Sequence, residues 1–167
     1  MLKALAQFVG NLISADSKYD KVKRREEIFA PVEEDGYRVF KSNCEACHKE
    51  PLFTDNSFRN NGLPLDNYLC DVGRMKITGA KEDSLKFKVP TLRNIARTYP
   101  YMHDGRFYSL DEVIEHYRKG IQTGLTLDSL LRNKISMTDI EKRDLILFLK
   151  TLTDTAFLKN PRYSQPL

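Results

Sequence analysis

The stretch Cys44-Glu45-Ala46-Cys47-His48 limits what this chain can fold into more than any other feature. It has the pattern Cys-x-x-Cys-His, the attachment signal for a c-type haem. Two thiols at this spacing can each add to one of the two haem vinyl groups, and the histidine is then held under the iron as its proximal ligand. We therefore expect one covalently bound haem c, attached through Cys44 and Cys47 and ligated by His48.

Two other uses of a cysteine pair agree less well with the sequence. A thioredoxin-type dithiol is typical of a βαβ pattern, which this chain does not show. A zinc site needs a second pair of ligands, whereas Cys70, His103 and His116 are scattered singly along the chain. We interpret Cys70 as a small buried hydrophobe with no chemical role.

Length and charge restrict the remaining possibilities. The 167 residues suffice for one domain with a hydrophobic core. The net charge of +4 comes from lysines and arginines spread along the chain, so no basic patch indicates a nucleic-acid partner. No apolar run has the length of a membrane span. Gln7 and Asn11 interrupt the N-terminal apolar stretch, which indicates an amphipathic helix rather than a signal peptide.

Apolar periodicity and capping signals predict a mostly helical chain. Helices are expected at 2–15, from Pro31 into the haem motif, over a short segment begun at Pro90, from 110 to 120, and after Thr138. The last two begin with capping boxes, in which a Ser or Thr is followed three residues later by Glu: Ser109 with Glu112, and Thr138 with Glu141.

Gly36, Tyr37 and Phe40, just ahead of the haem motif, resemble the N-terminal helix of class I cytochromes c, where the glycine allows a close crossing with the last helix. The predicted fold is therefore all-α, with a class I cytochrome c-like helical core around one haem c and long loops. The irregular segment 50–89 is expected to wrap the haem.

The sequence also suggests a division of the chain into three parts. We expect an inter-domain helix and linker at 1–27, with the polar stretch 14–27 as the linker. A haem domain is expected at 28–157, and a flexible tail at 158–167.

Six segments occur in an order that resembles the C-terminal half of the bacterial di-haem cytochrome c peroxidases and the related MauG proteins. The resemblance runs from about residue 4 to residue 157. The segments are Leu5-Ala6-Gln7-Phe8, Cys44-x-x-Cys47-His48, Pro51-Leu52-Phe53-Thr54-Asp55, Asp71-Val72-Gly73-Arg74, Phe87-Lys88-Val89-Pro90-Thr91-Leu92-Arg93-Asn94 and Pro100-Tyr101-Met102-His103-Asp104-Gly105.

The resemblance implies a periplasmic enzyme with two haem c domains. In that family the N-terminal haem reduces hydrogen peroxide, and the six-coordinate C-terminal haem passes in electrons from a small cytochrome or cupredoxin. This chain has one Cys-x-x-Cys-His, so we expect the electron-transferring half of such an enzyme, without catalytic residues of its own and without its N-terminal haem domain. Two alternatives are a stand-alone mono-haem electron carrier and a MauG-like oxidase domain.

We further expect the chain to be a piece of a longer exported protein, because haem c is attached outside the bacterial cytoplasmic membrane and no signal peptide is recognised in this sequence.

The second axial ligand of the iron stays open. The peroxidases usually have Met on the helix after the His-Asp-Gly loop; the matching residue here is Tyr117, and MauG has a Tyr ligand at that place. Met102, in a loop after a proline, resembles the ligand loop of class I cytochromes. Tyr117 and Met102 are thus both candidates, and His116, His103 or an open position are the other possibilities.

Four further residues are candidates for secondary roles. Arg93 and Arg106 could bind haem propionates, since guanidinium offers a planar fork to carboxylates. In the peroxidases, backbone carbonyls of the loop before the His bind a calcium ion between the two domains, and the matching residues are Thr98 and Pro100. Part of that shell would come from the other domain, so we expect an empty or weak calcium site here.

Overall fold

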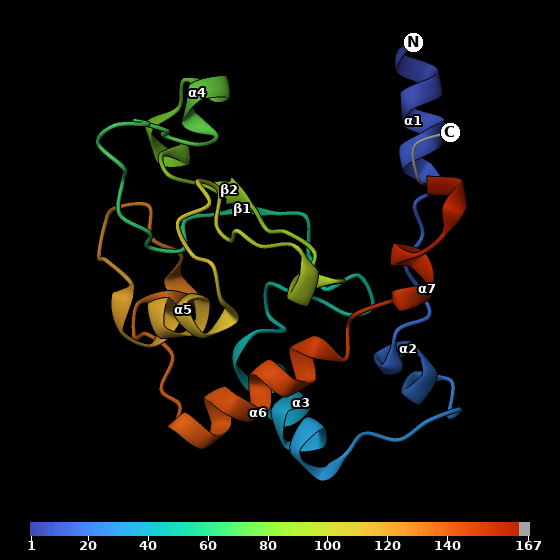
Figure 1. Cartoon of the computed structure of the whole chain (residues 1–167). Helices are drawn as coiled ribbons and strands as arrows, with labels where there is room; N and C mark the ends of the chain where they lie inside the picture. The colour runs from blue at the N-terminus through green and yellow to red at the C-terminus, as the bar shows by residue number, and fades with distance from the viewer. Residues whose placement is uncertain (164–167) are drawn as a thin grey trace.

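The computed structural model describes residues 1–163. Over this range the fold is mostly helical, as predicted, and two short strands, β1 (Phe58–Arg59) and β2 (Phe87–Lys88), pair antiparallel in the long loop region (Figure 1). The α-helices are α1 (Leu2–Gly10), α2 (Lys18–Lys23), α3 (Pro31–Asn43), α4 (Met75–Thr78), α5 (Leu110–Glu115), α6 (Asp139–Lys150) and α7 (Thr155–Leu158). Single turns form η1 (Lys81–Asp83), η2 (Ile95–Arg97), η4 (Ser129–Leu131) and η5 (Pro161–Tyr163), and η3 (His116–Gly120) is a π-helix.

The helices α3 and α6 cross in contact and form the main helix pair of the fold (Figure 1). Helix α3 begins at Pro31, which suits the first helical position because its missing N–H would have no helical partner there. A Cβ added at Gly36 would lie 2.0 Å from the backbone oxygen of Asp144. Only glycine permits this approach, so the predicted close crossing is confirmed.

Both predicted capping boxes are present. The Ser109 hydroxyl accepts a hydrogen bond from the backbone N–H of Glu112 and starts α5. In the same way, Thr138 accepts from Glu141 and starts α6. Helix α5 continues directly into η3, which ends at Gly120, the end that the sequence predicted.

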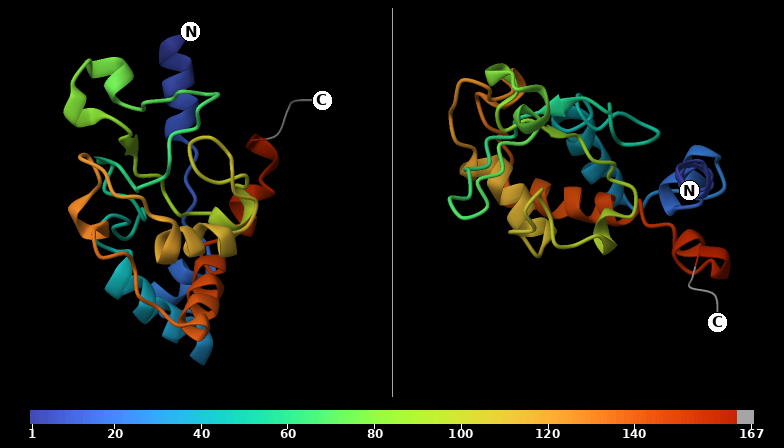
Figure 2. Two further views of the ribbon diagram at one scale, coloured as in Figure 1. Left: turned by 90° about the vertical axis from the view of Figure 1, so that its left-hand side faces the viewer. Right: turned by 90° about the horizontal axis from the view of Figure 1, so that it is seen from above.

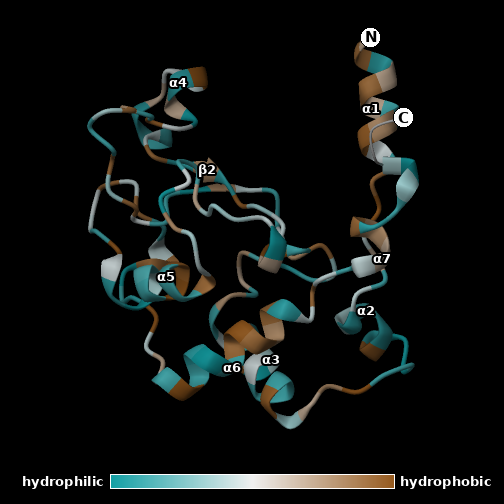
Figure 3. Ribbon diagram, viewed as in Figure 1, coloured by the Kyte–Doolittle hydropathy of each residue, from teal (hydrophilic) through white to brown (hydrophobic). Residues whose placement is uncertain are grey.

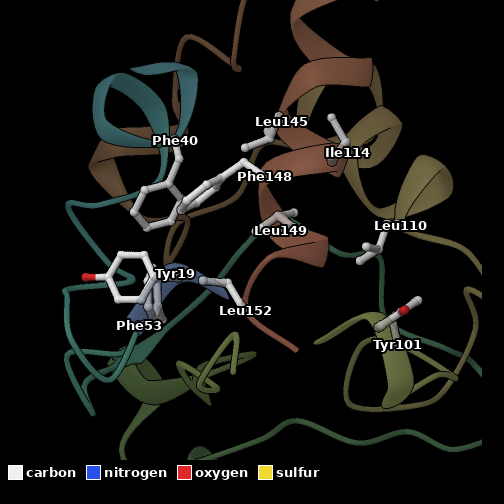
Figure 4. Packing of buried hydrophobic residues seen from close by; sticks show 10 residues of the cluster. All are labelled: Tyr19, Phe40, Phe53, Tyr101, Leu110, Ile114, Leu145, Phe148, Leu149 and Leu152. Carbon is white, nitrogen blue, oxygen red and sulfur yellow. The ribbon is translucent and has the colours of Figure 1, made fainter. Parts of the chain in front are cut away.

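The core is built around aromatic rings from separate parts of the chain (Figure 4). Phe40 of α3 and Phe148 of α6 have ring centroids 5.2 Å apart, and Tyr19 meets Phe53 edge-on at 4.8 Å. Such edge-to-face and tilted pairs add to the stabilisation that burial of the rings already gives. The remaining buried members of the cluster are Tyr101, Leu110, Ile114, Leu145, Leu149 and Leu152.

Residues 14–27 differ from the predicted linker, because they contain the helix α2 and contribute to the core. Tyr19 is only 2% exposed, and its backbone N–H donates to the carbonyl of Thr151 at 3.1 Å. The buried Asp154 carboxylate accepts from the backbone N–H groups of Ala15 and Asp16, both at 2.9 Å. The polar composition of this segment did not indicate the long-range bonds that hold its first residues against the core.

The long loops agree with the predicted irregular segment 50–89, with two differences in detail. Cys70 is exposed rather than buried, and its thiol donates to the Asn67 carbonyl at 3.0 Å. The short helix expected from Pro90 does not form there, since the turn η2 begins only after Asn94, whose φ of 61° interrupts a helix. Left-handed φ is tolerated by asparagine better than by most residues.

Helix α1 stands away from the rest of the fold (Figure 2), and Figure 3 shows that much of it is apolar. It ends at Gly10, earlier than the predicted residue 15, and none of its residues is buried. The C-terminal turn contacts its end, because the Tyr163 hydroxyl donates to the Asn11 carbonyl at 2.9 Å. The expected flexible tail at 158–167 therefore includes structured residues up to 163, and its last four residues lie outside the described part. No helix within residues 1–163 is both long enough and apolar enough to cross a membrane.

Candidate haem site

The Cys-x-x-Cys-His motif forms one turn directly after α3. The Cys44 N–H donates to the Phe40 carbonyl at 2.8 Å, which caps the helix. The backbone N–H groups of Cys47 and His48 both donate to the Cys44 carbonyl, at 3.2 and 3.0 Å. This turn holds the residues of the motif together, and their joint role in binding haem stays a prediction.

Both thiols are partly buried, and burial disfavours their charged forms. Burial raises the pKa of Cys44 to about 12 and also raises the pKa of Cys47. Neither cysteine is in a disulfide. A thioether carries no charge, so its burial has no ionic penalty, and the surroundings of both sulfur atoms fit a covalently attached haem.

His48 is held in the tautomer that an iron ligand needs. Its Nδ1 lies 3.1 Å from the Phe53 carbonyl oxygen and 3.2 Å from that of Pro90. Because carbonyls only accept hydrogen bonds, Nδ1 carries the proton and Nε2 keeps its lone pair. Burial lowers the pKa of His48, which keeps the imidazole neutral. The chain therefore offers a pre-oriented nitrogen ligand beside the two thiols.

Tyr117, the first distal candidate, lies in the π-helix η3 and is close to the cysteines. Burial is the largest cause that raises the pKa of its hydroxyl, and the charges of the Cys44 and Cys47 thiolates would raise it further. The Asn61 side chain opposes this shift and lowers the pKa. π-Helical turns often occur at functional sites, and this one places a phenol oxygen within electrostatic reach of both attachment sulfurs.

Met102, the second distal candidate, is held by the same asparagine. The Asn61 Nδ2 lies 3.5 Å from the Met102 sulfur, and Met102 has a left-handed φ of 69°. The neighbouring His116 is buried, and its Nε2 donates to the Asn61 carbonyl at 3.0 Å. This bond occupies Nε2, one of the two nitrogens through which His116 could bind a metal. Sequence reasoning did not identify Asn61, and the Asn60-Asn61-Gly62 turn pattern was its only local signal.

His103 has other contacts. Its ring stacks on Phe87 of β2 with centroids 3.7 Å apart, and its Nε2 lies 3.9 Å from an Asp104 carboxylate oxygen. Burial lowers the pKa of His103. The ring thus has a structural partner at the edge of the strand pair.

The two arginines proposed for the haem propionates both have carboxylate partners within the chain. Arg93 makes two hydrogen bonds to Asp20, each 2.9 Å, and donates from Nε to the Pro51 carbonyl at 3.0 Å. Arg106 pairs with Asp104 and reaches the Pro64 carbonyl at 3.0 Å. Arg93 ties the α2 segment to the haem domain, and the propionate role of either arginine stays a prediction.

Arg59 is a third guanidinium near the motif, which sequence reasoning missed. It pairs with Asp55 at 2.8 Å and with Asp128 at 2.7 Å, and its charge lowers the pKa of Cys47 against the larger effect of burial. It lines a groove of about 700 Å³ whose lining includes none of Cys44, Cys47, His48 and Tyr117. The other lining residues are Ser57, Phe58, Asn60, Lys81, Glu82, Lys86, Leu125, Thr126, Leu127 and Asp128.

The predicted calcium position has few of the oxygen ligands that calcium needs. The Thr98 hydroxyl donates to the Ile95 carbonyl at 3.3 Å, and Pro100 is exposed. Within residues 1–163, no three side chains of His, Cys, Asp or Glu gather in an arrangement that could hold a metal ion. A calcium ion here would depend on backbone carbonyls and on oxygens from outside the chain.

Comparison with known proteins agrees with this geometry. Residues 33–153 match the cytochrome c family. The chain is 36% identical over 154 residues to the methylamine utilization protein MauG of Methylorubrum extorquens, which covers 89% of this chain and 42% of that protein. It is also 36% identical over 154 residues to the cytochrome c551 peroxidase of Nitrosomonas europaea, with 90% and 43% covered. The chain thus spans less than half the length of these two relatives.

Solved structures show the same similarity in three dimensions. A MauG-like protein associated with microbial copper homeostasis has a TM-score of 0.82 and 35% identity, over 92% of this chain and 52% of that one. The diheme peroxidase BthA from Burkholderia thailandensis has a TM-score of 0.65 at 22% identity, over 85% and 47% of the two chains. The predicted cytochrome c fold and the predicted similarity to di-haem peroxidases and MauG proteins are both confirmed.

Proposed function

The chain belongs to the cytochrome c family, and on that premise we propose that it is the electron-transferring haem c domain of a di-haem cytochrome c peroxidase. The observation that carries this proposal is the turn in which His48 Nδ1 is bonded to two carbonyls, so that Nε2 keeps its lone pair, in the same motif as two partly buried thiols. Haem c, when bound, supplies a one-electron redox centre. The names of the relatives support a peroxidase or MauG-type protein as the larger context.

Each residue of the site has a definite part in this proposal. Cys44 and Cys47 would anchor the haem, and His48 would offer its Nε2 to the iron. Tyr117 is the proposed distal ligand, because its phenol is the candidate group that lies within electrostatic reach of both cysteines. Met102 is the second candidate. Cys44, Cys47 and His48 are all partly buried in the fold.

The proposed partners follow from the length of the relatives and from their names. A second, N-terminal haem domain would complete the protein, hydrogen peroxide would be the final oxidant, and a small cytochrome c or cupredoxin would be the electron donor. We place such a protein in the periplasm, where haem c is attached. No part of the described fold indicates a nucleic-acid partner, since its arginines near the site are paired with carboxylates.

A MauG-like oxidase domain is the second candidate function. The observation in its favour is Tyr117, a phenol rather than a thioether at the position that the peroxidases usually give to Met. The MauG-like structure with 35% identity supports the same alternative. A tyrosine ligand would give the haem a lower reduction potential than a methionine ligand, since methionine ligation raises the potential.

Covalent haem attachment tests the proposed function directly. For this test the chain is expressed with an export signal in cells that carry the haem c attachment machinery. The measured quantity is the haem that stays on the protein after denaturation and acidic organic extraction. The wild-type chain is expected to retain one haem, and the Cys44→Ser, Cys47→Ser double variant is expected to lose it. Cys70→Ser is the matched control, because that thiol is exposed and lies outside the motif. Complete extraction of haem from the wild type would exclude the proposal.

For calcium, we propose that Thr98 and Pro100 supply at most two backbone oxygens. A cation of this type takes six to eight oxygen ligands, so the chain alone would bind it weakly. Added calcium is therefore expected to leave the thermal midpoint of the haem-loaded chain unchanged, and a clear upward shift would show a complete site.

A further inference from the structure

Two backbone carbonyls share the Nδ1 proton of His48. The Phe53 oxygen lies 3.1 Å and the Pro90 oxygen 3.2 Å from that nitrogen. An imidazole Nδ1 has a single hydrogen, so the two contacts form one bifurcated hydrogen bond. The hydrogen lies between the two oxygens only while both backbone segments keep their places. Whatever joins these segments therefore also positions the His48 ring.

Two threonine side chains join the segments in a crossed arrangement. The Thr54 hydroxyl donates to the Val89 carbonyl at 2.7 Å, and the Thr91 hydroxyl donates to the Leu52 carbonyl at 2.5 Å. Each threonine thus lies on one segment and binds the backbone of the other. We call these two threonines, with the two carbonyls that they bind, the threonine latch.

The two acceptors of the His48 proton lie within the threonine latch. Thr54 directly follows Phe53, and Thr91 directly follows Pro90. The residue whose carbonyl each threonine binds directly precedes the other acceptor residue. Each carbonyl that faces His48 is therefore held on both sides in the sequence, once by a hydroxyl donor and once by a hydroxyl acceptor.

The direction of both hydroxyl groups is fixed by further bonds. The Thr54 oxygen accepts from the Asn56 N–H at 3.0 Å, and the Thr91 oxygen accepts from the Arg93 N–H at 3.2 Å. A hydroxyl has one hydrogen, and a carbonyl can only accept. The hydroxyl hydrogen therefore points across the latch in both threonines, while a lone pair of the same oxygen holds the turn that follows.

The backbone at Phe53 depends on contacts of this kind. Phe53 has a left-handed φ of 54°, which is uncommon for an aromatic residue. Such a conformation persists where the surrounding structure holds it in place. The Phe53 ring is fully buried, and its carbonyl also accepts from the Leu92 N–H at 3.3 Å. The direction of this carbonyl is thus set by the segment that the latch binds.

We propose that Thr54 and Thr91 are positioning residues that keep both carbonyls on His48 Nδ1 and thereby lower the reduction potential of the haem iron. This inference rests on the proposed function, in which His48 ligates a haem c. An acceptor at Nδ1–H makes the other ring nitrogen more basic. A more basic ligand stabilises ferric iron more than ferrous iron, and hydrogen bonds around the ligands are one of the means by which a protein sets the potential.

The test compares valine and serine variants of the full chain with its covalent haem. Thr54→Val and Thr91→Val replace the hydroxyl by a methyl group of similar shape. Each is expected to raise the reduction potential, and the double valine variant is expected to raise it more than either single variant. Thr54→Ser and Thr91→Ser keep the hydroxyl and are expected to keep the wild-type potential.

A second measurement follows the hydrogen bond itself. Exchange of the His48 Nδ1 proton with solvent, measured by proton NMR of the haem-loaded chain, is expected to be faster in the valine variants. Thr78→Val is the matched control for both measurements. The Thr78 oxygen likewise accepts from an N–H two residues later, its side chain is exposed, and its bonds stay within residues 74–83. This variant is expected to change neither the potential nor the exchange rate.

The outcomes separate this inference from the proposed function. Failure of the wild type to hold covalent haem would refute the proposed function itself. Covalent haem with an unchanged potential and exchange rate in the double valine variant would overturn the positioning role alone. Serine variants that shift as far as the valine variants would also overturn it, because the hydroxyl would then not be the cause. If the double variant takes up no haem, Thr91→Val, at an exposed residue, decides by the same two measurements.

Discussion

The Cα of Gly36 faces the backbone carbonyl of Asp144 so closely that a Cβ would come within 2.0 Å of that oxygen. The contact joins α3, which leads into the haem motif, to α6, which carries Phe148 of the core. Because backbone atoms lie on the far side, no side-chain rotation could relieve a clash. The position of the turn that carries the haem motif thus depends on a glycine 8 residues before Cys44, because any side chain there would meet the backbone of α6.

Gly36→Ala is expected to destabilise the haem-loaded chain by about 3 kcal/mol, the upper part of the range for overpacked sites. Urea unfolding would show this as a lower midpoint. Gly10→Ala is the matched control, since a Cβ at Gly10 would meet nothing within 4 Å, and it should be neutral or slightly stabilising. Equal midpoints for Gly36→Ala and the wild type would show that the helices are not in close contact.

The Asp20–Arg93 pair predicts a pH dependence of stability. Burial raises the pKa of Asp20, but the hydrogen bonds from Arg93 and Ser17 outweigh it, and the net shift is downward. A carboxylate with a lowered folded-state pKa stabilises the fold above its unfolded-state pKa, and this contribution is lost as the pH falls toward the folded-state value. Both side chains are nearly buried, 11% and 10% exposed.

Asp20→Asn is therefore expected to lower the free energy of unfolding at pH 7 by about 3 kcal/mol, since it leaves a buried guanidinium without its ion partner. The difference from the wild type should shrink as the pH falls below about 4. Asp16→Asn is the control, because the Asp16–Arg24 pair is exposed and should contribute less than about 1 kcal/mol. A difference that grows on acidification would contradict the assignment.

Removal of N-terminal residues should separate the role of α1 from that of α2. Deletion of residues 1–13 is expected to leave the unfolding midpoint nearly unchanged, because α1 has no buried residue. Deletion of residues 1–27 also removes Tyr19 and Asp20. It should lower the free energy of unfolding by at least about 3–5 kcal/mol, the usual cost of removing one buried aromatic side chain. Equal stability of the two shortened chains would restore the view of 14–27 as a linker.

Distal ligation can be tested by single substitutions at the two candidates. With Tyr117 on the iron, Tyr117→Phe is expected to change the ferric spectrum, and Met102→Ala is expected to leave it unchanged. The opposite pattern, with a near-infrared band lost only in the methionine variant, would assign Met102. Electronic spectra of both variants in both oxidation states provide the measurement.

Peroxide turnover should be slow in the isolated, haem-loaded chain. Reaction with peroxide needs an open iron position, and His48 together with Tyr117 or Met102 would occupy both. The rate of peroxide loss with a reduced electron donor measures this directly. Tyr117→Phe with Met102→Ala, which removes both candidates, is expected to react faster than the wild type. Rapid turnover by the wild type would mean that the distal position is open.

Local patterns determined much of the fold from the sequence alone. The haem motif, the two capping boxes and Pro31 act through hydrogen bonds and steric limits that span only a few residues, and each lies where the sequence placed it. Gly36 was also recognised, because its spacing to the haem motif matched a known helix crossing. Cys44, Cys47 and His48 form a local turn after α3, and their role in haem attachment stays a prediction.

Tertiary structure decided the features that depend on residues far apart in the chain. Arg93 is bonded to Asp20 across 73 positions, and Asn61 reaches Met102 across 41. Tyr19 lies in a polar segment, and only the packing of its ring against Phe53 shows that this segment belongs to the core. Such pairs leave no periodic signal, because side-chain donors and acceptors meet wherever the folded backbone brings them. The sequence alone therefore predicted the haem motif and the local helix signals, and the packed chain decided which distant groups lie together.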